Sequence, residues 1–511
     1  MLKRFNSDTG YKYFFYPLCA VIVLLYSYVA LTSYGYDDEY FNIRMIREHD
    51  MQSLIYTIQH TDIHPPLSYI LNKCIYALFR DWAFVRLFSA FLFLSSLIYL
   101  LSKTKDNSQR LILLLFLGIN PTVLLWATSI RWYAYVLPLI ILLHRIPDYK
   151  QTYYWWRFFI IGLIISFLGY IGLVITGMYF LVYWIKDEHK WPLKLKRIIF
   201  PAVLFLMIYA YQVWVFFFVH IKTDLENNPQ QYNFVTSALA YVSSAFSNQG
   251  LFPLSVFGLI SIAGMGLIML YSLIYFRKNL LNNSSFIVYF SLSLFFIFSG
   301  IAGKVRNLFL IEPSRISFIS LLHRNKYAGI YFIGLSMLVI GNVAGIYNIL
   351  THQGTTKNAW NLDMHKNLEL LDQYARKDSK TFYFTHHPSY VYHLNVKGKD
   401  VVSFYNSLYF DTTVVSHRKT PDIALHSYPY DIVFIINYRG QSISAKHYSD
   451  LLASIRSVKA DSVKHVYSGK DGLYKLKRKY FSDYPAYTTE FIWFYGVRDD
   501  GGKLGLWEKN Q

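Results

Sequence analysis

The chain contains few cysteines and few charged residues. Two of its 511 residues are cysteines, Cys19 and Cys74, and both lie in apolar stretches. Two cysteines so placed exclude a disulfide framework and indicate no metal site. Charged residues form 16% of the chain, against about 25% in soluble domains. The net charge is +19, but no separate basic arm carries it, so nucleic acid is not expected as a partner.

The chain is correspondingly rich in apolar and aromatic residues. Hydrophobic residues make up 54% of the chain and aromatic residues 19%, whereas soluble domains are about 45–50% apolar. The excess is concentrated in runs of about 15–25 residues, a length that crosses or nearly crosses a bilayer. Aromatic side chains favour membrane interfaces, where one end of the ring stays in water. The composition therefore predicts a polytopic α-helical membrane protein.

The N-terminal segment resembles a signal sequence but offers no cleavage site. Lys3, Arg4 and Lys12 precede an apolar run over residues 14–31. This run is longer than the apolar region of a typical signal peptide, and residues 31–34 contain no small-x-small pattern. We expect an uncleaved first span with its N-terminus in the cytoplasm, because cationic residues favour that side.

Charge alternation supports a topology of about eleven spans. The predicted spans cover residues 14–33, 84–101, 110–126, 132–146, 157–170, 172–185, 198–220, 250–276, 284–302, 307–322 and 327–349. If the chain begins in the cytoplasm, the cytoplasmic loops are those rich in Lys and Arg: 103–110, 145–157, 186–197, 277–278 and 323–326. The agreement with the positive-inside rule tests the count, because one wrong span would invert every later loop.

The first outer loop, residues 34–83, is predicted to carry two helices at the membrane surface. One lies near residues 39–54 and the other over residues 66–79. In the second, apolar residues recur at helical spacing, and Ser68, Asn72 and Lys73 occupy the other side. This segment is too short to span the bilayer, so we place it flat on the outer surface.

After residue 350 the composition becomes polar and no further span is predicted. The predicted strands cover 381–384, 401–404 and 431–438, and the predicted helices cover 364–376 and 445–456. We therefore expect two domains: a transmembrane domain over residues 1–349 and an α/β domain over residues 350–511. An odd number of spans places the second domain outside the cytoplasm.

Three acids follow the first span directly. Asp37, Asp38 and Glu39 lie just beyond the apolar run, where acids beside a membrane are costly and usually functional. One acid here would be explained as a helix cap, because a carboxylate complements the positive end of a helix. Three acids are more than a cap needs, so we expect a catalytic role.

Asp62 and His64 belong to the segment Asp-Ile-His-Pro-Pro-Leu at residues 62–67. The prolines fit a turn that opens a helix, since proline is favoured at the first helical position. Such a turn does not require the acid or the histidine. Substrate binding is therefore the functional interpretation of Asp62 and His64, and a structural turn is the alternative.

Three arginines lie at the outer ends of predicted spans. They are Arg86, Arg131 and Arg306. The simple explanation is that each side chain extends to the membrane interface, but the positive-inside rule disfavours arginine on this side. A guanidinium binds phosphate oxygens through two parallel hydrogen bonds. The three arginines therefore favour recognition of a phosphate beside the acidic loop.

Taken in order, these motifs resemble membrane glycosyltransferases of the GT-C type. The resemblance is to protein O-mannosyltransferases and to the lipid A aminoarabinose transferase, and it covers residues 14–349. It rests on the acidic pair at 38–39, the Pro-Pro-Leu segment at 62–67, the Arg-x-x-Ser-Ala start of a span at 86–90, the Arg-x-Tyr of Arg131 and Tyr133, and the Arg and Pro at 306 and 313. Asn307 departs from the pattern, which has Arg-Tyr at this point.

The resemblance implies an inverting glycosyltransferase with a polyprenyl-phosphate sugar as donor. It makes Asp38 the catalytic base, with Asp37 as the alternative, and gives Glu39 a supporting role. Substrate-binding roles fall to Asp37, Asp62, His64, Arg86, Arg131, Tyr133 and Arg306. A divalent cation at Asp37 and Asp38 is left open, since no ligand set for a metal or other cofactor is evident.

The acceptor expected by resemblance is a glycolipid, a polysaccharide or a protein hydroxyl, at a bacterial inner membrane. Two other classes are considered. A lipid-linked glycan transporter or flippase would place ionisable groups near the middle of the bilayer, whereas the acids here gather at one outer face. A polysaccharide polymerase would be expected to use a large later loop, and residues 221–249 form only a modest one.

Overall fold

The computed structural model divides the chain into two compact units. The first comprises residues 1–34 and 42–358, and the second comprises residues 35–41 and 359–511. The structure describes residues 8–32, 37–61, 64–144, 152–187, 189–215, 238, 241–242, 256–280, 282–299, 309–322, 329–350, 367–376, 379–385, 390, 394, 397–403, 430–438, 462–468 and 488–497.

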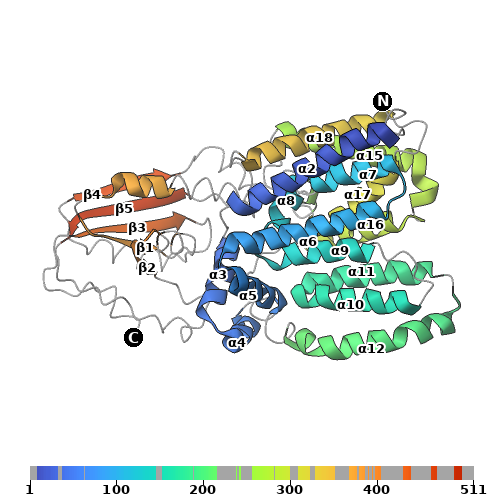
Figure 1. The fold of residues 1–511 in the computed structure, drawn as a ribbon, viewed down its shortest axis with the longest axis horizontal. Helices are drawn as coiled ribbons and strands as arrows, with labels where there is room; N and C mark the ends of the chain where they lie inside the picture. Colours follow the sequence, from blue (N-terminus) through green and yellow to red (C-terminus); the bar gives the residue numbers. More distant parts are fainter. Residues whose placement is uncertain are drawn as a thin grey trace. The chain divides into compact units, whose positions relative to one another are not determined.

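The first unit is built from helices (Figure 1). They are α2 (Asp8–Thr32), α3 (Asp37–Glu48), α4 (Met51–Thr61), α5 (Leu67–Phe79), α6 (Trp82–Ser102), α7 (Asn107–Leu113), the π-helix η1 (Leu114–Gly118), α8 (Pro121–Ala127), α9 (Trp132–His144), α10 (Thr152–Leu168), α11 (Tyr170–Lys186), α12 (Trp191–Val215), α15 (Val256–Leu280), α16 (Ser284–Phe298), α17 (Glu312–Leu321) and α18 (Gly329–Leu350). Helix α3 crosses the division between the units, because its residues 37–41 are grouped with the second.

Five described helices are long and apolar enough to cross a membrane by themselves: α2, α6, α12, α15 and α18. A sixth span results if α7, η1 and α8 count as one bent crossing. The shorter apolar helices are α5, α9, α10, α11 and α16. At 1.5 Å of rise per residue, a helix of about 15 residues covers about 22 Å of a hydrocarbon core that is about 30 Å thick. The remainder of the expected eleven spans therefore stays a prediction.

The structure breaks the continuous span that the sequence predicted over residues 110–126. Helix α8 begins after a bend of 63° from the preceding helical segment. Asn120 caps α8, because its Oδ1 accepts hydrogen bonds from the backbone N–H groups of Thr122 and Val123 at 2.9 and 3.2 Å. Pro121 occupies the first turn of α8. Proline is tolerated there and disfavours helical geometry in the residue before it, which explains the break.

The predicted first outer loop contains three helices, α3, α4 and α5, where the sequence predicted two. Helix α5 turns its polar side toward the protein: Ser68 and Asn72 are buried. At its C-terminal end, Leu78 and Phe79 are 78% and 51% exposed. Exposed apolar side chains on a short helix are typical of a membrane interface. The polar residues of this amphipathic helix therefore serve contacts inside the protein.

Polar side chains make hydrogen bonds at the end of α3 and at the start of α4. Lys73 Nζ donates to the carbonyl oxygens of Ile46 and His49 at 2.8 and 2.5 Å, at the end of α3 where a cation is favoured. Asp50 Oδ1 accepts from the backbone N–H of Ser53 at 2.7 Å, and the hydrogen bonds from Ser53 lower the pKa of the Asp50 carboxyl. Lys73 thus ties α5 to the end of α3.

The described part of the second unit is a five-stranded sheet in the order β2-β1-β3-β5-β4 (Figure 1). Its strands are β1 (Thr381–Thr385), β2 (Asp400–Ser403), β3 (Tyr430–Tyr438), β4 (Ser462–Ser468) and β5 (Thr488–Val497). Strand β1 is parallel to β2 and β3, whereas β5 is antiparallel to β3 and β4. A helical segment over residues 367–374 packs on the sheet through Leu368 and Leu371, against Tyr383, Val433 and Trp493.

Strands β1, β2 and β3 lie where the sequence predicted strands, and the helical segment over residues 367–374 lies within the predicted helix. Strands β4 and β5 were not predicted. The helix expected over residues 445–456 lies outside the described residues. The domain boundary at 349/350 and the outside location of the second domain remain predictions.

Candidate active site

The predicted catalytic acids lie at the start of α3. This helix begins at Asp37, but the side chains of Asp37 and Asp38 are outside the described part of the structure. The side chain of Glu39 is described, and it is fully buried. A buried carboxylate requires polar partners, so Glu39 is held within the protein. Asp62 and Arg306, two predicted substrate-binding residues, also lie outside the described residues.

Arg131 lies in the turn between α8 and α9, and its side chain is 5% exposed. Its Nη1 donates to Asn42 Oδ1 on α3 at 2.7 Å and to the Tyr69 hydroxyl on α5 at 3.3 Å. An arginine that merely anchors the chain at a membrane interface would extend its guanidinium into water. Arg131 is instead directed by two helices of the first outer loop.

The backbone of the same turn is held by two carboxamides. Asn42 Nδ2 and Asn72 Nδ2 both donate to the carbonyl oxygen of Ile130, at 2.7 and 3.2 Å. Asn72 Oδ1 in turn accepts from the Tyr135 hydroxyl at 2.5 Å. Both asparagines are fully buried. We call Asn42, Asn72 and the Ile130 carbonyl the Ile130 clamp, and it fastens α3 and α5 to the turn that carries Arg131.

Helix α6 carries Arg86, a predicted phosphate-binding residue. Ser89 Oγ on the same helix donates to the backbone carbonyl oxygen of Val85 at 3.1 Å. Arg86 lies three residues before Ser89 on the same helix and is 7% exposed. Asp81 caps α6, since its Oδ1 accepts from the backbone N–H of Ala83 at 2.9 Å. Arg86 is therefore the fifth residue of a helix that packs along α9.

Aromatic rings surround the residues that follow Arg131. The Tyr133 ring centroid lies 5.1 Å from Trp126 and 5.8 Å from Phe309. His64, a predicted binding residue, lies with its ring 5.4 Å from Trp132. Trp132 also packs against Gly169, where a Cβ atom would come within 2.6 Å of the indole. Such close aromatic packing fixes Tyr133 and Trp132 in place and brings His64 to the same turn.

A second buried polar cluster lies at the break before α8. Asn120 Nδ2 donates to Glu312 Oε2 at 3.0 Å, and Arg315 donates to the same oxygen through Nε at 3.1 Å and Nη2 at 2.5 Å. Glu312 and Arg315 belong to α17, and both are buried. Glu312 lies within the predicted span over residues 307–322, so it is an exception to the prediction that the acids gather at one outer face.

The sequence analysis missed Asn42, Tyr69, Asn72, Asn120 and Glu312. Asn72 had a visible signal, because it lies on the polar side of an amphipathic segment, but that side was interpreted as facing solvent. No sequence pattern pointed to Asn42, because it belongs to no motif and the helix around it mixes polar and apolar residues. Among the described residues, no group of three His, Cys, Asp or Glu side chains is arranged to hold a metal ion.

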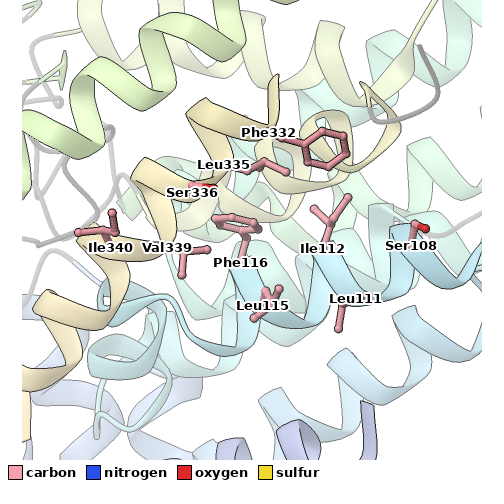
Figure 2. A pocket seen from close by; sticks show the side chains of 10 residues that line it. All are labelled: Ser108, Leu111, Ile112, Leu115, Phe116, Phe332, Leu335, Ser336, Val339 and Ile340. Atoms are coloured by element: carbon pink, nitrogen blue, oxygen red, sulfur yellow. The ribbon is translucent and has the colours of Figure 1, made fainter. Parts of the chain in front are cut away.

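An apolar groove lies between the α7–η1 segment and α18 (Figure 2). Its volume is about 400 Å³. Its lining residues are Ser108, Leu111, Ile112, Leu115, Phe116, Phe332, Leu335, Ser336, Val339 and Ile340. Two serine hydroxyls are the polar side-chain groups in this lining, so the groove suits a hydrocarbon chain.

The chain has a GT-C-like fold, as a comparison with solved structures shows. Among solved structures, the chain is similar to the crystal structure of ArnT from Cupriavidus metallidurans in the apo state. ArnT is the lipid A aminoarabinose transferase, a GT-C enzyme. The similarity covers 87% of this chain and 95% of that chain, with a TM-score of 0.50 and 13% sequence identity. It confirms the resemblance to GT-C proteins at the level of the fold.

No protein-family model matches the chain, and no curated protein matches it. The fold is therefore shown by structural similarity, and the chemistry has to be argued from the residues of this chain.

Proposed function

We propose that the chain is an inverting glycosyltransferase that transfers a sugar from a polyprenyl-phosphate donor to an acceptor outside the cytoplasm. The observation that carries this proposal is the contact between Arg131 and Asn42 at 2.7 Å. It links the turn that bears a buried guanidinium to α3, the helix that begins with Asp37, Asp38 and Glu39. A proton acceptor and a phosphate-binding group are the two functions that this transfer needs.

The reaction is a single displacement at the anomeric carbon. The acceptor hydroxyl gives its proton to the Asp38 carboxylate, and its oxygen forms a bond to the anomeric carbon. The bond between that carbon and the phosphate oxygen breaks, and polyprenyl phosphate leaves with the electron pair. General-base catalysis of this kind contributes about 10²–10⁴-fold. Attack from the face opposite to the leaving group inverts the anomeric centre.

The arginines act on the leaving group. Negative charge grows on the phosphate as the bond breaks, and a guanidinium fixed in advance stabilises that charge without reorganisation. We assign this role to Arg131, together with Arg86 and Arg306. Glu39 supports the acceptor side, and Asp37, Asp62, His64 and Tyr133 complete the substrate-binding set. A divalent cation remains an option at Asp37 and Asp38, and no step here depends on it.

The apolar groove offers a place for the lipid tail of the donor. Its lining includes Leu115 and Phe116 of η1, and the chain runs from η1 through α8 to the Arg131 turn. A tail in this groove would therefore follow one continuous segment from the phosphate into the bilayer. This arrangement suits a donor that is partly lipid, and it explains the need for many spans.

The proposed topology places the N-terminus in the cytoplasm and the first outer loop and the second unit outside, with about eleven spans in a bacterial inner membrane. The acceptor is a glycolipid, a polysaccharide or a protein hydroxyl. Support comes from the charge alternation of the sequence and from the GT-C fold.

The buried Glu312–Arg315 pair supports one alternative. Ionisable groups inside a helical membrane protein, next to a broken helix, are typical of transporters, and Asn120 at the break contacts Glu312. A transporter or flippase would move a lipid-linked glycan intact. A glycosyltransferase would instead transfer the sugar to an acceptor and release polyprenyl phosphate. A polysaccharide polymerase would also transfer the sugar and release the lipid carrier.

The experiment that tests the proposal compares glycolipids and surface glycans from cells with and without the gene by mass spectrometry. Transfer predicts the loss of one sugar residue from one acceptor. Membranes that contain the protein should also convert the polyprenyl-phosphate form of that sugar into polyprenyl phosphate. Movement of the lipid-linked sugar across the membrane, with no release of polyprenyl phosphate, would instead favour the flippase. A polymerase predicts the loss of a whole repeating polymer rather than of one sugar.

A further inference from the structure

Asn42 contacts both the side chain and the backbone of the turn that carries Arg131. Its Oδ1 accepts from Arg131 Nη1 at 2.7 Å, and its Nδ2 donates to the Ile130 carbonyl at 2.7 Å. A carboxamide is suited to this pair of contacts, because it presents an acceptor and a donor side by side. Asn42 is fully buried, so its orientation is set by these contacts rather than by water.

Asn42 also lies close to the catalytic acids along α3. It follows Asp38 by four residues and Glu39 by three, which are the spacings that place side chains on one face of a helix. A shift of α3 that moves the acids therefore moves the partner of Arg131. Asn42 therefore connects the helix that carries the acids to the Arg131 guanidinium.

We propose that Asn42 is a positioning residue that orients the Arg131 guanidinium toward the donor phosphate. This inference rests on the proposed function. The amide oxygen gives a directional hydrogen bond and adds no negative charge. A carboxylate at the same place would bind a guanidinium more strongly, and it would reduce the positive potential that attracts the phosphate. The neutral carboxamide fixes Arg131 and leaves its charge available to the donor.

Asn72 provides a matched comparison. It donates to the same Ile130 carbonyl as Asn42, and it is equally buried. Its oxygen, however, accepts from the Tyr135 hydroxyl rather than from Arg131. The substitutions Asn42→Asp and Asn72→Asp both remove a hydrogen bond to Ile130 and both add one buried carboxyl. Only Asn42→Asp places that carboxyl on Arg131.

The test measures the dissociation constant of undecaprenyl phosphate for the full chain in lipid nanodiscs, with thermal unfolding recorded on the same samples. Asn42→Asp should weaken binding by about ten- to a hundredfold. This is the change in dissociation constant expected when the phosphate loses one charge-assisted hydrogen bond from Arg131. Asn72→Asp should weaken it clearly less, although both variants lose a clamp contact. If Asn42→Asp does not fold, Asn42→Ala is measured in its place. It should also weaken binding, because it removes the hydrogen bond that orients the Arg131 guanidinium.

The outcomes separate this inference from the proposed function. If Arg131→Ala binds undecaprenyl phosphate less well than the parent, but Asn42→Asp and Asn72→Asp bind it equally, the positioning role of Asn42 is overturned and the proposed function stands. If Arg131→Ala binds like the parent, both the role of Asn42 and the assignment of Arg131 are overturned. A selective loss in Asn42→Asp, at unfolding temperatures similar to those of Asn72→Asp, supports the inference.

Discussion

The Asn120 side chain and the Glu312 carboxylate form a hydrogen bond of 3.0 Å between the helix break and α17. Asn120 also caps α8 through its other side-chain atom. Helix α8 leads into the Arg131 turn, and Phe309, three residues before Glu312, packs against Tyr133 beyond that turn. Residues 309–312 therefore contact both sides of the Arg131 turn, through Glu312 before it and Phe309 after it.

The first prediction concerns the Glu312–Arg315 pair. Glu312→Ala should destabilise the protein strongly, by about 3–5 kcal/mol, because it leaves a buried arginine without its carboxylate. Glu312→Gln should cost less, since the amide still accepts from Arg315. The Arg44–Glu48 pair, with a contact of 3.0 Å, is the control, because its two side chains are 29% and 28% exposed whereas the Glu312–Arg315 pair is buried. Glu48→Ala should cost about 0–1 kcal/mol. Equal unfolding temperatures for Glu312→Ala and Glu48→Ala would contradict this account.

Helices and strands could be predicted from the sequence where an apolar pattern extends over many residues. Apolar runs predicted helices such as α2, α6 and α18, and the strand β3 was predicted from its unbroken apolar stretch. The break at Asn120 and Pro121 was also encoded locally, but hydropathy averaged over a window concealed it.

The site was less predictable, because its contacts join residues that are far apart in the chain. Motifs drew attention to Arg131, Tyr133 and His64, and the structure brings these to one turn. Asn42 and Asn72 could not be assigned, since one shared partner is the backbone carbonyl of Ile130 and their side-chain partners, Arg131 and Tyr135, lie about 60 to 90 residues further along the chain. The polar side of α5 was assigned to solvent because amphipathicity shows that two faces differ, not which one is buried.

The second prediction concerns topology. In a background of Cys19→Ser and Cys74→Ser, Ile63→Cys and Gln373→Cys should react with a membrane-impermeant thiol reagent in intact cells. Lys105→Cys and Lys190→Cys should react only after the membrane is opened, because Lys-rich loops favour the cytoplasm. Labelling of Lys105→Cys in intact cells would mean that α5 crosses the membrane and that every later loop is inverted.

The third prediction concerns the catalytic base. Asp38→Asn keeps the shape of the side chain and removes its basicity, so transfer should fall by about 10²–10⁴-fold with normal membrane insertion. Asp50→Asn is the control in the same loop, because asparagine caps a helix as well as aspartate does, and it should retain activity. If Asp38→Asn is active and Asp37→Asn is not, the base is Asp37. Activity in both variants would rule out the acidic pair as the source of catalysis.

The last prediction concerns the arginines assigned to the donor phosphate. Arg131→Lys keeps the charge but loses the planar fork with which a guanidinium binds two phosphate oxygens at once. Loss of one charge-assisted hydrogen bond is worth roughly 1.5–3 kcal/mol, so donor use should fall by about one to two orders of magnitude. Arg131→Ala should be impaired more severely, and alanine at Arg86 or Arg306 should raise the donor KM as well.

Arg157 provides the control for this series, because it lies at the opposite end of the helical unit by the proposed topology and contacts the Tyr99 hydroxyl. Arg157→Lys should leave the donor KM close to that of the parent. The assay is the rate of polyprenyl phosphate release at varied donor concentration, with the amount of folded protein measured for each variant. Parental donor KM and rate in Arg86→Ala, Arg131→Ala and Arg306→Ala together would show that these arginines do not bind the donor phosphate. The phosphate would then have to be bound by other residues.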